Sequence, residues 1–209
     1  MMLDIYVINL EERVDRWQHI VKTFGNDFNL IRVDAIKHNE GWKGCFLSHK
    51  KCLQIAKEKK LQNIIVMEDD CDKLNNNFVD RLYKIKEYLN NNDKWYIFLG
   101  GTFCTTKKNI IKKINYEHDN LFEINYGFCT QLVIYNNKSY DKIIDYEINE
   151  PIDNIWPKLF NSLISIPFLT TQVLSYSNIN TDKISSFTQK INSTNKRLTK
   201  LLESKLLEF

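Results

Sequence analysis

The chain has 209 residues, of which 43% are hydrophobic and 12% aromatic, so it can bury the core of one globular domain. The formal net charge is only +3, and no stretch concentrates Lys and Arg as a phosphate-tracking surface would. Nucleic acid is therefore excluded from the expected partners.

Strands and helices alternate in the first half of the chain. Apolar runs predict buried strands, and apolar residues at helical spacing predict helices. The expected elements are strands at 3–10, 29–36, 64–67 and 95–100, and helices at 13–25, 45–60 and 78–89, with a turn at 41–44 before the second helix. This order predicts an α/β fold with a largely parallel central sheet flanked by helices.

Beyond Gly101 the order of elements changes. We expect a short strand pair at 110–116 and 120–126, a strand at 127–136, helices at 138–148 and 151–161, and one last strand from 164. No linker or repeat separates a second domain, so one domain is predicted over residues 1–180. The remaining residues, 181–209, are expected to form a polar, amphipathic helical tail that allows weak contact with a membrane surface or with a second copy of the chain.

Five cysteines form no CxxC pair, which argues against a zinc framework or a complete disulfide set and predicts free thiols in a reducing compartment. The first apolar run has the wrong flanks for a signal peptide, and no apolar run approaches the ~18 residues of a membrane span. We therefore expect a soluble, cytoplasmic protein.

Three carboxylates, Glu68, Asp69 and Asp70, directly follow the apolar strand at 64–67. Adjacent buried carboxylates are costly unless a cation lies among them, and ligands of open parallel sheets bind beyond the carboxyl ends of strands. Oxygen ligands on such a turn suit Mn²⁺ or Mg²⁺. We expect Asp70 to touch the metal directly, with Glu68 or Asp69 holding neighbouring donors; a solvated acidic turn without a ligand is the alternative.

A second group, Asn9, Arg13 and Arg16, follows the first strand and should face the same crevice. Arginine matches phosphate in a bidentate fork, so this group is expected to bind an anionic substrate. Ordinary surface ion pairs with Glu12 or Asp15 are the alternative.

The stretch GCFLSHKKC supplies a third group, Ser48 and His49. Both are expected early in a helix, where exposed N–H groups and the positive end of the helix dipole favour an anion or a sugar hydroxyl. For His49 the alternative is a packed, hydrogen-bonded histidine.

These motifs, followed by WYIFLGG, NYGFCTQLVIYN, PID and IPFLTTQVLSYSNI, resemble glycosyltransferase family 25, the lipopolysaccharide and procollagen sugar transferases. The resemblance covers roughly residues 3–180 and implies a single GT-A-like domain that uses a nucleotide-diphosphate sugar. It also implies that residues 68–70 are the metal-binding acidic motif and that residues 7–16 line the nucleotide. The family's late Gln corresponds to Gln172, an expected substrate contact, but the later Ser177–Ile179 has Asn where the family often has Asp.

The function implied by the resemblance is transfer of a hexose, galactose or glucose, from a UDP-sugar to a glycan or protein acceptor, with Mn²⁺ and inversion at the anomeric carbon. Asp153 in PIDNIW is the candidate base that takes the acceptor proton, and a helix N-cap is its alternative role. Two rival functions remain open: a non-catalytic relative that binds a nucleotide sugar or glycan, and a nucleotidyltransferase on a similar sheet.

Overall fold

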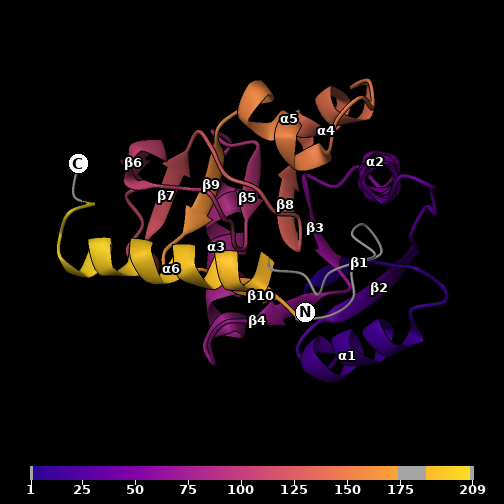
Figure 1. Ribbon diagram of the computed structural model, residues 1–209, viewed down its shortest axis with the longest axis horizontal. Helices are drawn as coiled ribbons and strands as arrows, with labels where there is room; N and C mark the ends of the chain where they lie inside the picture. The colour runs from indigo at the N-terminus through magenta and orange to yellow at the C-terminus, as the bar shows by residue number, and fades with distance from the viewer. Residues whose placement is uncertain (1, 174–186, 208–209) are drawn as a thin grey trace.

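The computed structural model describes residues 2–173 and 187–207. In this described part, a central eight-stranded sheet has the strand order β2-β1-β3-β8-β5-β9-β7-β6, and β10 and β4 form a separate pair (Figure 1). The strands are β1 (Asp4–Asn9), β2 (Asn29–Asp34), β3 (Asn63–Glu68), β4 (Cys71–Lys73), β5 (Ile97–Leu99), β6 (Ile110–Lys113), β7 (Leu121–Ile124), β8 (Leu132–Asn136), β9 (Ser162–Ser165) and β10 (Thr170–Gln172). The helices are α1 (Val14–Phe24), α2 (Gly41–Glu58), α3 (Phe78–Asn91), α4 (Asn137–Ile144), α5 (Ile152–Leu159) and α6 (Phe187–Glu203), with a short 3-10 helix at Lys107–Asn109.

The predicted α/β fold, with a central sheet flanked by helices, is confirmed. β1 lies between β2 and β3 and runs parallel to both, with Asn9 opposite Asp34 and Ile8 opposite Glu68. The carboxyl ends of β1 and β3 therefore meet at one edge. Antiparallel pairing begins at β8, which runs against both β3 and β5. Among the described strands, the large sheet has three parallel and four antiparallel pairs.

Two apolar clusters cover the two faces of the sheet. Along β3, Ile64 and Val66 belong to the cluster under α2, α4, α5 and α6, whereas Ile65 and Met67 belong to the cluster under α1 and α3. Burial on both faces explains why this strand is an unbroken apolar run rather than an alternating one. The polar residues that follow it are held at the edge of a rigid, two-sided core.

The structure corrects the prediction of one last strand from residue 164. Two strands occur there instead: β9 lies in the large sheet, and β10 leaves it to pair antiparallel with β4. Hydrophobic periodicity did not reveal β4 because it has only three residues, two of them polar. This small pair matters for the site because Gln172 lies opposite Cys71, directly after the acidic triplet.

The turn expected at 41–44 is also corrected, since α2 already begins at Gly41. Gly44 is needed for close packing: a Cβ atom there would lie 2.5 Å from the Ile36 carbonyl oxygen. A glycine read as a turn signal is thus a contact point between α2 and the segment after β2.

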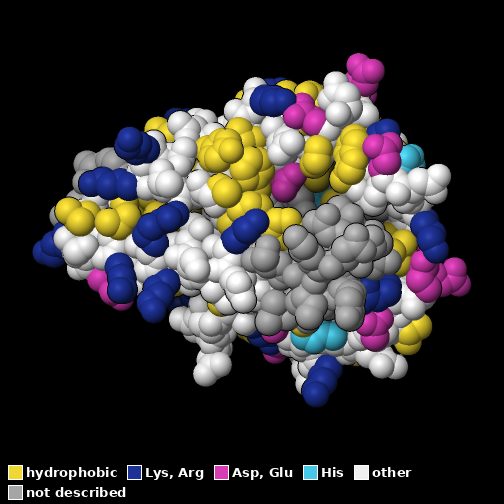
Figure 2. All heavy atoms as spheres, in the orientation of Figure 1, with side chains coloured by type: hydrophobic (Ala, Val, Ile, Leu, Met, Phe, Trp, Pro, Cys, Tyr) yellow, Lys and Arg dark blue, Asp and Glu magenta, His cyan; other side chains and the backbone are white. Residues whose placement is uncertain are grey.

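The tail forms α6, which buries Ile191, Thr194 and Leu198 against the body of the protein. Its other side exposes Lys190, Lys196, Arg197 and Lys200. Figure 2 shows basic side chains gathered on the left of the molecule, where α6 lies in Figure 1. The expected domain boundary at residue 180 lies outside the described residues. None of the described helices is both long and apolar enough to cross a bilayer.

One buried ion pair fixes α3 to the loop before β7. The Arg81 Nε and Nη2 atoms donate to the two carboxylate oxygens of Asp119 at 2.8 and 2.9 Å, and Nη2 also donates to the Pro167 carbonyl at 2.7 Å. The two side chains are only 9% and 4% exposed.

Replacing Asp119 by Ala should therefore leave a buried, unpaired guanidinium and lower the free energy of unfolding by about 3 kcal/mol. The control is Asp80→Ala on the same helix, which breaks the exposed pair with Lys84 and should lower it by less than about 1 kcal/mol. Urea denaturation measures both variants, and equal losses would contradict the assigned role of the buried pair.

Candidate functional site

A cavity opens where the carboxyl ends of β1 and β3 face the first half of α2. Its lining includes Arg16, Cys45, Ser48 and all three carboxylates of residues 68–70, together with the segment Ala35–His38. The parallel pairing of β1 with β3 places the Asn9–Arg16 segment beside the acidic triplet. The sequence predicted this arrangement at the carboxyl ends of the strands.

Asp69 is held by two side chains from the end of β1 and from α1. It is 7% exposed, and its carboxylate oxygens accept from Asn9 Nδ2 at 2.8 Å and from Arg16 Nη1 at 2.7 Å. Asn9 Nδ2 also donates to the Arg13 carbonyl at 3.1 Å. Both oxygens of Asp69 thus have partners within the protein, and Asp69 in turn anchors Arg16 at the cavity.

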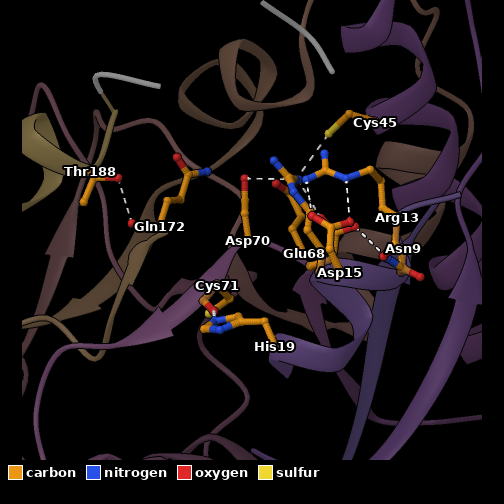
Figure 3. A network of polar contacts seen from close by, with 12 residues as sticks. Asn9, Arg13, Asp15, His19, Cys45, Glu68, Asp70, Cys71, Gln172 and Thr188 are labelled. Atoms are coloured by element: carbon orange, nitrogen blue, oxygen red, sulfur yellow. Dashed lines mark hydrogen bonds and ion pairs between the residues drawn. The ribbon is translucent and has the colours of Figure 1, made fainter. Parts of the chain in front are cut away.

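Within the residues that the structure describes, Asp70, drawn in Figure 3, has fewer polar contacts through its carboxylate than Asp69. Its Oδ1 is buried without a hydrogen-bond partner among the described residues, and its Oδ2 lies 3.8 Å from Arg16 Nη1. Burial, followed by the negative charge of Glu68, raises the pKa of Asp70 to about 8, although Arg16 acts in the opposite direction. A buried carboxylate oxygen that lacks a partner and lines a cavity fits a hard divalent cation.

Glu68 is held by side chains of α2. His49 Nε2 lies 3.2 Å from Glu68 Oε1, and the Cys45 thiol donates to the same oxygen at 3.5 Å. Burial acts to raise the pKa of Glu68, but the interactions with His49, followed by the hydrogen bonds of Thr130 and Cys45, together outweigh it and the pKa lies below its ordinary value. Successive side chains of a strand alternate in direction, which explains why Glu68 and Asp69 have different partners.

Ser48 and His49 lie in the third turn of α2, because the helix begins at Gly41. The prediction that Ser48 and His49 lie beside the exposed N–H groups of the first turn is therefore wrong. Ser48 Oγ donates to the Gly44 carbonyl at 2.7 Å and accepts from Ile36 N at 2.8 Å, so it fixes one wall of the cavity. His49 is fully buried and hydrogen-bonded, the packed arrangement that was its alternative.

The two arginines have different surroundings. Arg13 makes a bidentate contact with Asp15 on the surface, at 3.0 and 2.9 Å, which is the surface pair named as its alternative. Arg16 lines the cavity beside Asp69 and Asp70. Gln172 reaches the same region through β10 (Figure 3). The Val173 N–H donates to the Asp70 carbonyl at 2.7 Å.

Asp153 lies in the first turn of α5, whose N-cap position is occupied by Pro151. The alternative role of Asp153 as N-cap is therefore wrong. Burial, followed by the negative charge of Glu68, raises the pKa of Asp153 to about 6. The electrostatic effects of Glu68 and His49 on this carboxyl connect α5 with the site formed by α2 and β3.

Sequence reasoning missed Cys45 and Tyr135. Tyr135 Oη lies 2.9 Å from His49 Nδ1, although the two residues are 86 positions apart, and no local pattern signals that contact. Cys45 did carry a signal, because residues at i and i+4 share one face of a helix and His49 follows it by four.

Residues 39–150 match the model of glycosyltransferase family 25 (LPS biosynthesis protein), which is more than half of the chain. The chain belongs to glycosyltransferase family 25. The resemblance inferred from the motifs is confirmed, and the chain is placed among glycosyltransferases. The family 25 match includes α2 and the acidic triplet.

No curated protein sequence matches this family 25 chain significantly. Among solved structures, A197 from STIV is 11% identical, with a TM-score of 0.43, over 79% of this chain and 84% of that one. A glycosyltransferase involved in glycosylation of the major capsid of PBCV-1 is also 11% identical, with a TM-score of 0.38, over 68% and 64%. Apo UDP-glucose pyrophosphorylase is 10% identical, with a TM-score of 0.45, over 93% and 81%.

The raised pKa of Asp70 has a consequence for stability. The folded chain holds one proton more than the unfolded chain between pH about 4 and about 8, so this group's contribution to stability falls as pH rises through that window. Asp70→Asn has no such proton to lose. In EDTA, its free energy of unfolding relative to wild type should therefore be higher at pH about 8 than at pH about 5.

Urea denaturation at both pH values measures this difference. Asp72→Asn removes the neighbouring carboxylate of β4 and serves as the matched control for the loss of one nearby charge. A pH-independent difference for Asp70→Asn would contradict the assigned protonation of Asp70.

Proposed function

We propose that this family 25 protein transfers a hexose, galactose or glucose, from a UDP-sugar to a glycan or protein acceptor, with a divalent metal and inversion of the anomeric configuration. The observation that carries the proposal is the buried Oδ1 of Asp70, which has no hydrogen-bond partner within residues 2–173 and 187–207 and lies in a cavity that Arg16 also lines. Carboxylate and guanidinium side by side suit a metal-bound diphosphate, because the metal meets the carboxylate and Arg meets the remaining phosphate charge.

The donor half of the reaction would be served by residues 9–16 and 68–70. Asp70 would hold Mn²⁺ or Mg²⁺, with Asp69 and Glu68 as neighbouring donors, and the bound metal would neutralise charge on the departing diphosphate. Arg16 is aligned by Asp69 at 2.7 Å, so its orientation is fixed before substrate binds. Asn9 holds the other Asp69 oxygen, and Arg13, Ser48, His49 and Gln172 are proposed as further substrate contacts or supports.

The acceptor half would depend on Asp153. A carboxyl whose pKa is raised to about 6 is a stronger base than an ordinary carboxylate and is still largely ionised at neutral pH. In the proposed reaction Asp153 takes the proton of the attacking hydroxyl while Arg16 stabilises the leaving diphosphate. An inverting transfer needs the base and the leaving group on opposite sides of the sugar, so Asp153 and Arg16 are assigned to opposite halves of the proposed site.

Metal-dependent binding of UDP tests the donor site. Asp70→Asn keeps the shape of the side chain and removes the negative charge of the proposed metal ligand, so the Mn²⁺-dependent affinity for UDP should fall tenfold or more, about 1.4 kcal/mol. Calorimetric titration with Mn²⁺ and with EDTA measures it. Asp72→Asn is the control and should bind like wild type, whereas unchanged affinity in Asp70→Asn would refute the metal assignment.

Substitution of the proposed base tests the transfer step. Asp153→Asn should lower turnover by about 10²- to 10⁴-fold, while UDP affinity stays close to wild type, because a base acts only during transfer. Release of UDP from UDP-galactose or UDP-glucose measures turnover. In wild type kcat/KM should fall as pH drops below about 6, where Asp153 becomes protonated.

That pH dependence should be absent from the residual activity of Asp153→Asn. Asp145→Asn, a change of the same kind at the end of α4, should leave turnover unchanged. Wild-type turnover in Asp153→Asn would eliminate the base assignment. Metal-dependent UDP binding without any sugar transfer, in wild type as well, would instead indicate a non-catalytic nucleotide-sugar binder.

A further inference from the structure

We infer that Cys45, His49 and Glu68 form a second cation site, specific for a thiophilic divalent metal of the Zn²⁺ class, between α2 and the end of β3. This site goes beyond the proposed transfer reaction, whose metal is centred on Asp70. It shares Glu68 with that oxygen site but takes its other two ligands, Cys45 and His49, from α2.

The ligand atoms of the three side chains lie close to the spacing that tetrahedral coordination requires. Their ligand atoms all lie within 4.8 Å of one another, with Glu68 Oε1 at 3.2 Å from His49 Nε2 and at 3.5 Å from Cys45 Sγ. Zinc bonds of about 2.0–2.3 Å place tetrahedral ligand atoms about 3.3–3.7 Å apart. Small side-chain movements therefore suffice for all three atoms to reach one ion.

The helix fixes two of these ligands in advance. Cys45 and His49 are separated by four residues and project from one face of α2, and Gly44 holds this part of the helix against the segment after β2. Glu68 is the last residue of β3, a strand whose preceding residues are buried. The ligands thus come from two rigid elements, so little conformational entropy would be lost on binding.

Tyr135 supplies the supporting contact that metal-bound histidines usually have. Its hydroxyl lies 2.9 Å from His49 Nδ1, which leaves Nε2 directed at Glu68. A tyrosine hydroxyl can donate to Nδ1 or accept from it, so the contact persists when Nε2 takes a metal and Nδ1 carries the proton.

The ligand set decides the kind of metal. A thiolate, an imidazole and a carboxylate together favour Zn²⁺, Cd²⁺ or Co²⁺ over Mg²⁺ or Mn²⁺. Binding would release the Cys45 thiol proton to solvent, and the thiolate and the Glu68 carboxylate would then balance the two charges of the ion. Cys45 and Glu68 both line the cavity, which provides an entry path and room for a fourth ligand such as water.

Titration of the full-length protein with Co²⁺ tests this site directly, because thiolate ligation gives a charge-transfer absorption band that oxygen ligation does not. Wild type should show the band, saturating at one Co²⁺ per chain, and excess Zn²⁺ but not Mg²⁺ should abolish it. Cys45→Ser should lose the band while keeping a wild-type thermal unfolding profile. Cys104→Ser, at an exposed cysteine outside the cluster, should keep it.

Absence of the band in wild type, or an undiminished band in Cys45→Ser, would overturn the inference. If Cys45→Ser fails to fold, Glu68→Gln tests the same ligand set and should weaken Co²⁺ binding at least tenfold; wild-type affinity in that variant would also overturn it. Asp70→Asn should keep the band, which separates this site from the proposed donor site. Failure of UDP binding would leave the cobalt result untouched.

Discussion

The contact of Asp69 with Asn9 and Arg16 is the interaction on which the rest of the candidate site depends. It joins the end of β3 to the end of β1 and to α1. Asn9 Nδ2 donates to one carboxylate oxygen of Asp69 at 2.8 Å and Arg16 Nη1 donates to the other at 2.7 Å, so both oxygens of the first carboxylate after β3 are occupied. Because Asp69 engages Arg16 most closely, Asp70 keeps a buried oxygen that has no hydrogen-bond partner in the described part of the chain. Arg16 thus compensates the buried charge of Asp69 more than that of Asp70, and the cost of burying a charge at Asp70 stays largely uncompensated.

The three carboxylates meet the cost of burial in three different ways. Glu68 is compensated by His49, Asp69 is compensated by Arg16 and Asn9, and Asp70 is left with a pKa raised to about 8. A protein without a ligand here would gain stability from a neutral residue at position 70, so the arrangement is typical of a binding site rather than of a structural one. In the proposed function that unfavourable energy is relieved when metal and diphosphate bind.

Helix α2 connects this edge of the sheet with the acceptor side of the proposed site. Its third turn reaches Glu68 through His49, and the charge of Glu68 in turn acts on Asp153 of α5. Close packing at Gly44 sets the position of α2 against the segment after β2, and Ser48 adds two hydrogen bonds to the same contact. A shift of this helix would change the surroundings of both proposed catalytic halves.

The sequence by itself determined the α/β class, the family and the position of the acidic triplet at a strand end, because apolar periodicity and ordered motifs are local properties. It also placed Asn9 and Arg16 correctly beside that triplet, since parallel strands share one edge. Only the tertiary structure decided which carboxylate oxygen has no hydrogen-bond partner among the described residues. It also decided that Arg13 pairs with Asp15 whereas Arg16 enters the cavity, and that Cys45 and Tyr135 join His49. These outcomes depend on contacts between residues far apart in the chain and on where α2 begins. The cost of burying the three carboxylates is shared among their neighbours in space, so the order of residues alone cannot assign it to one of them.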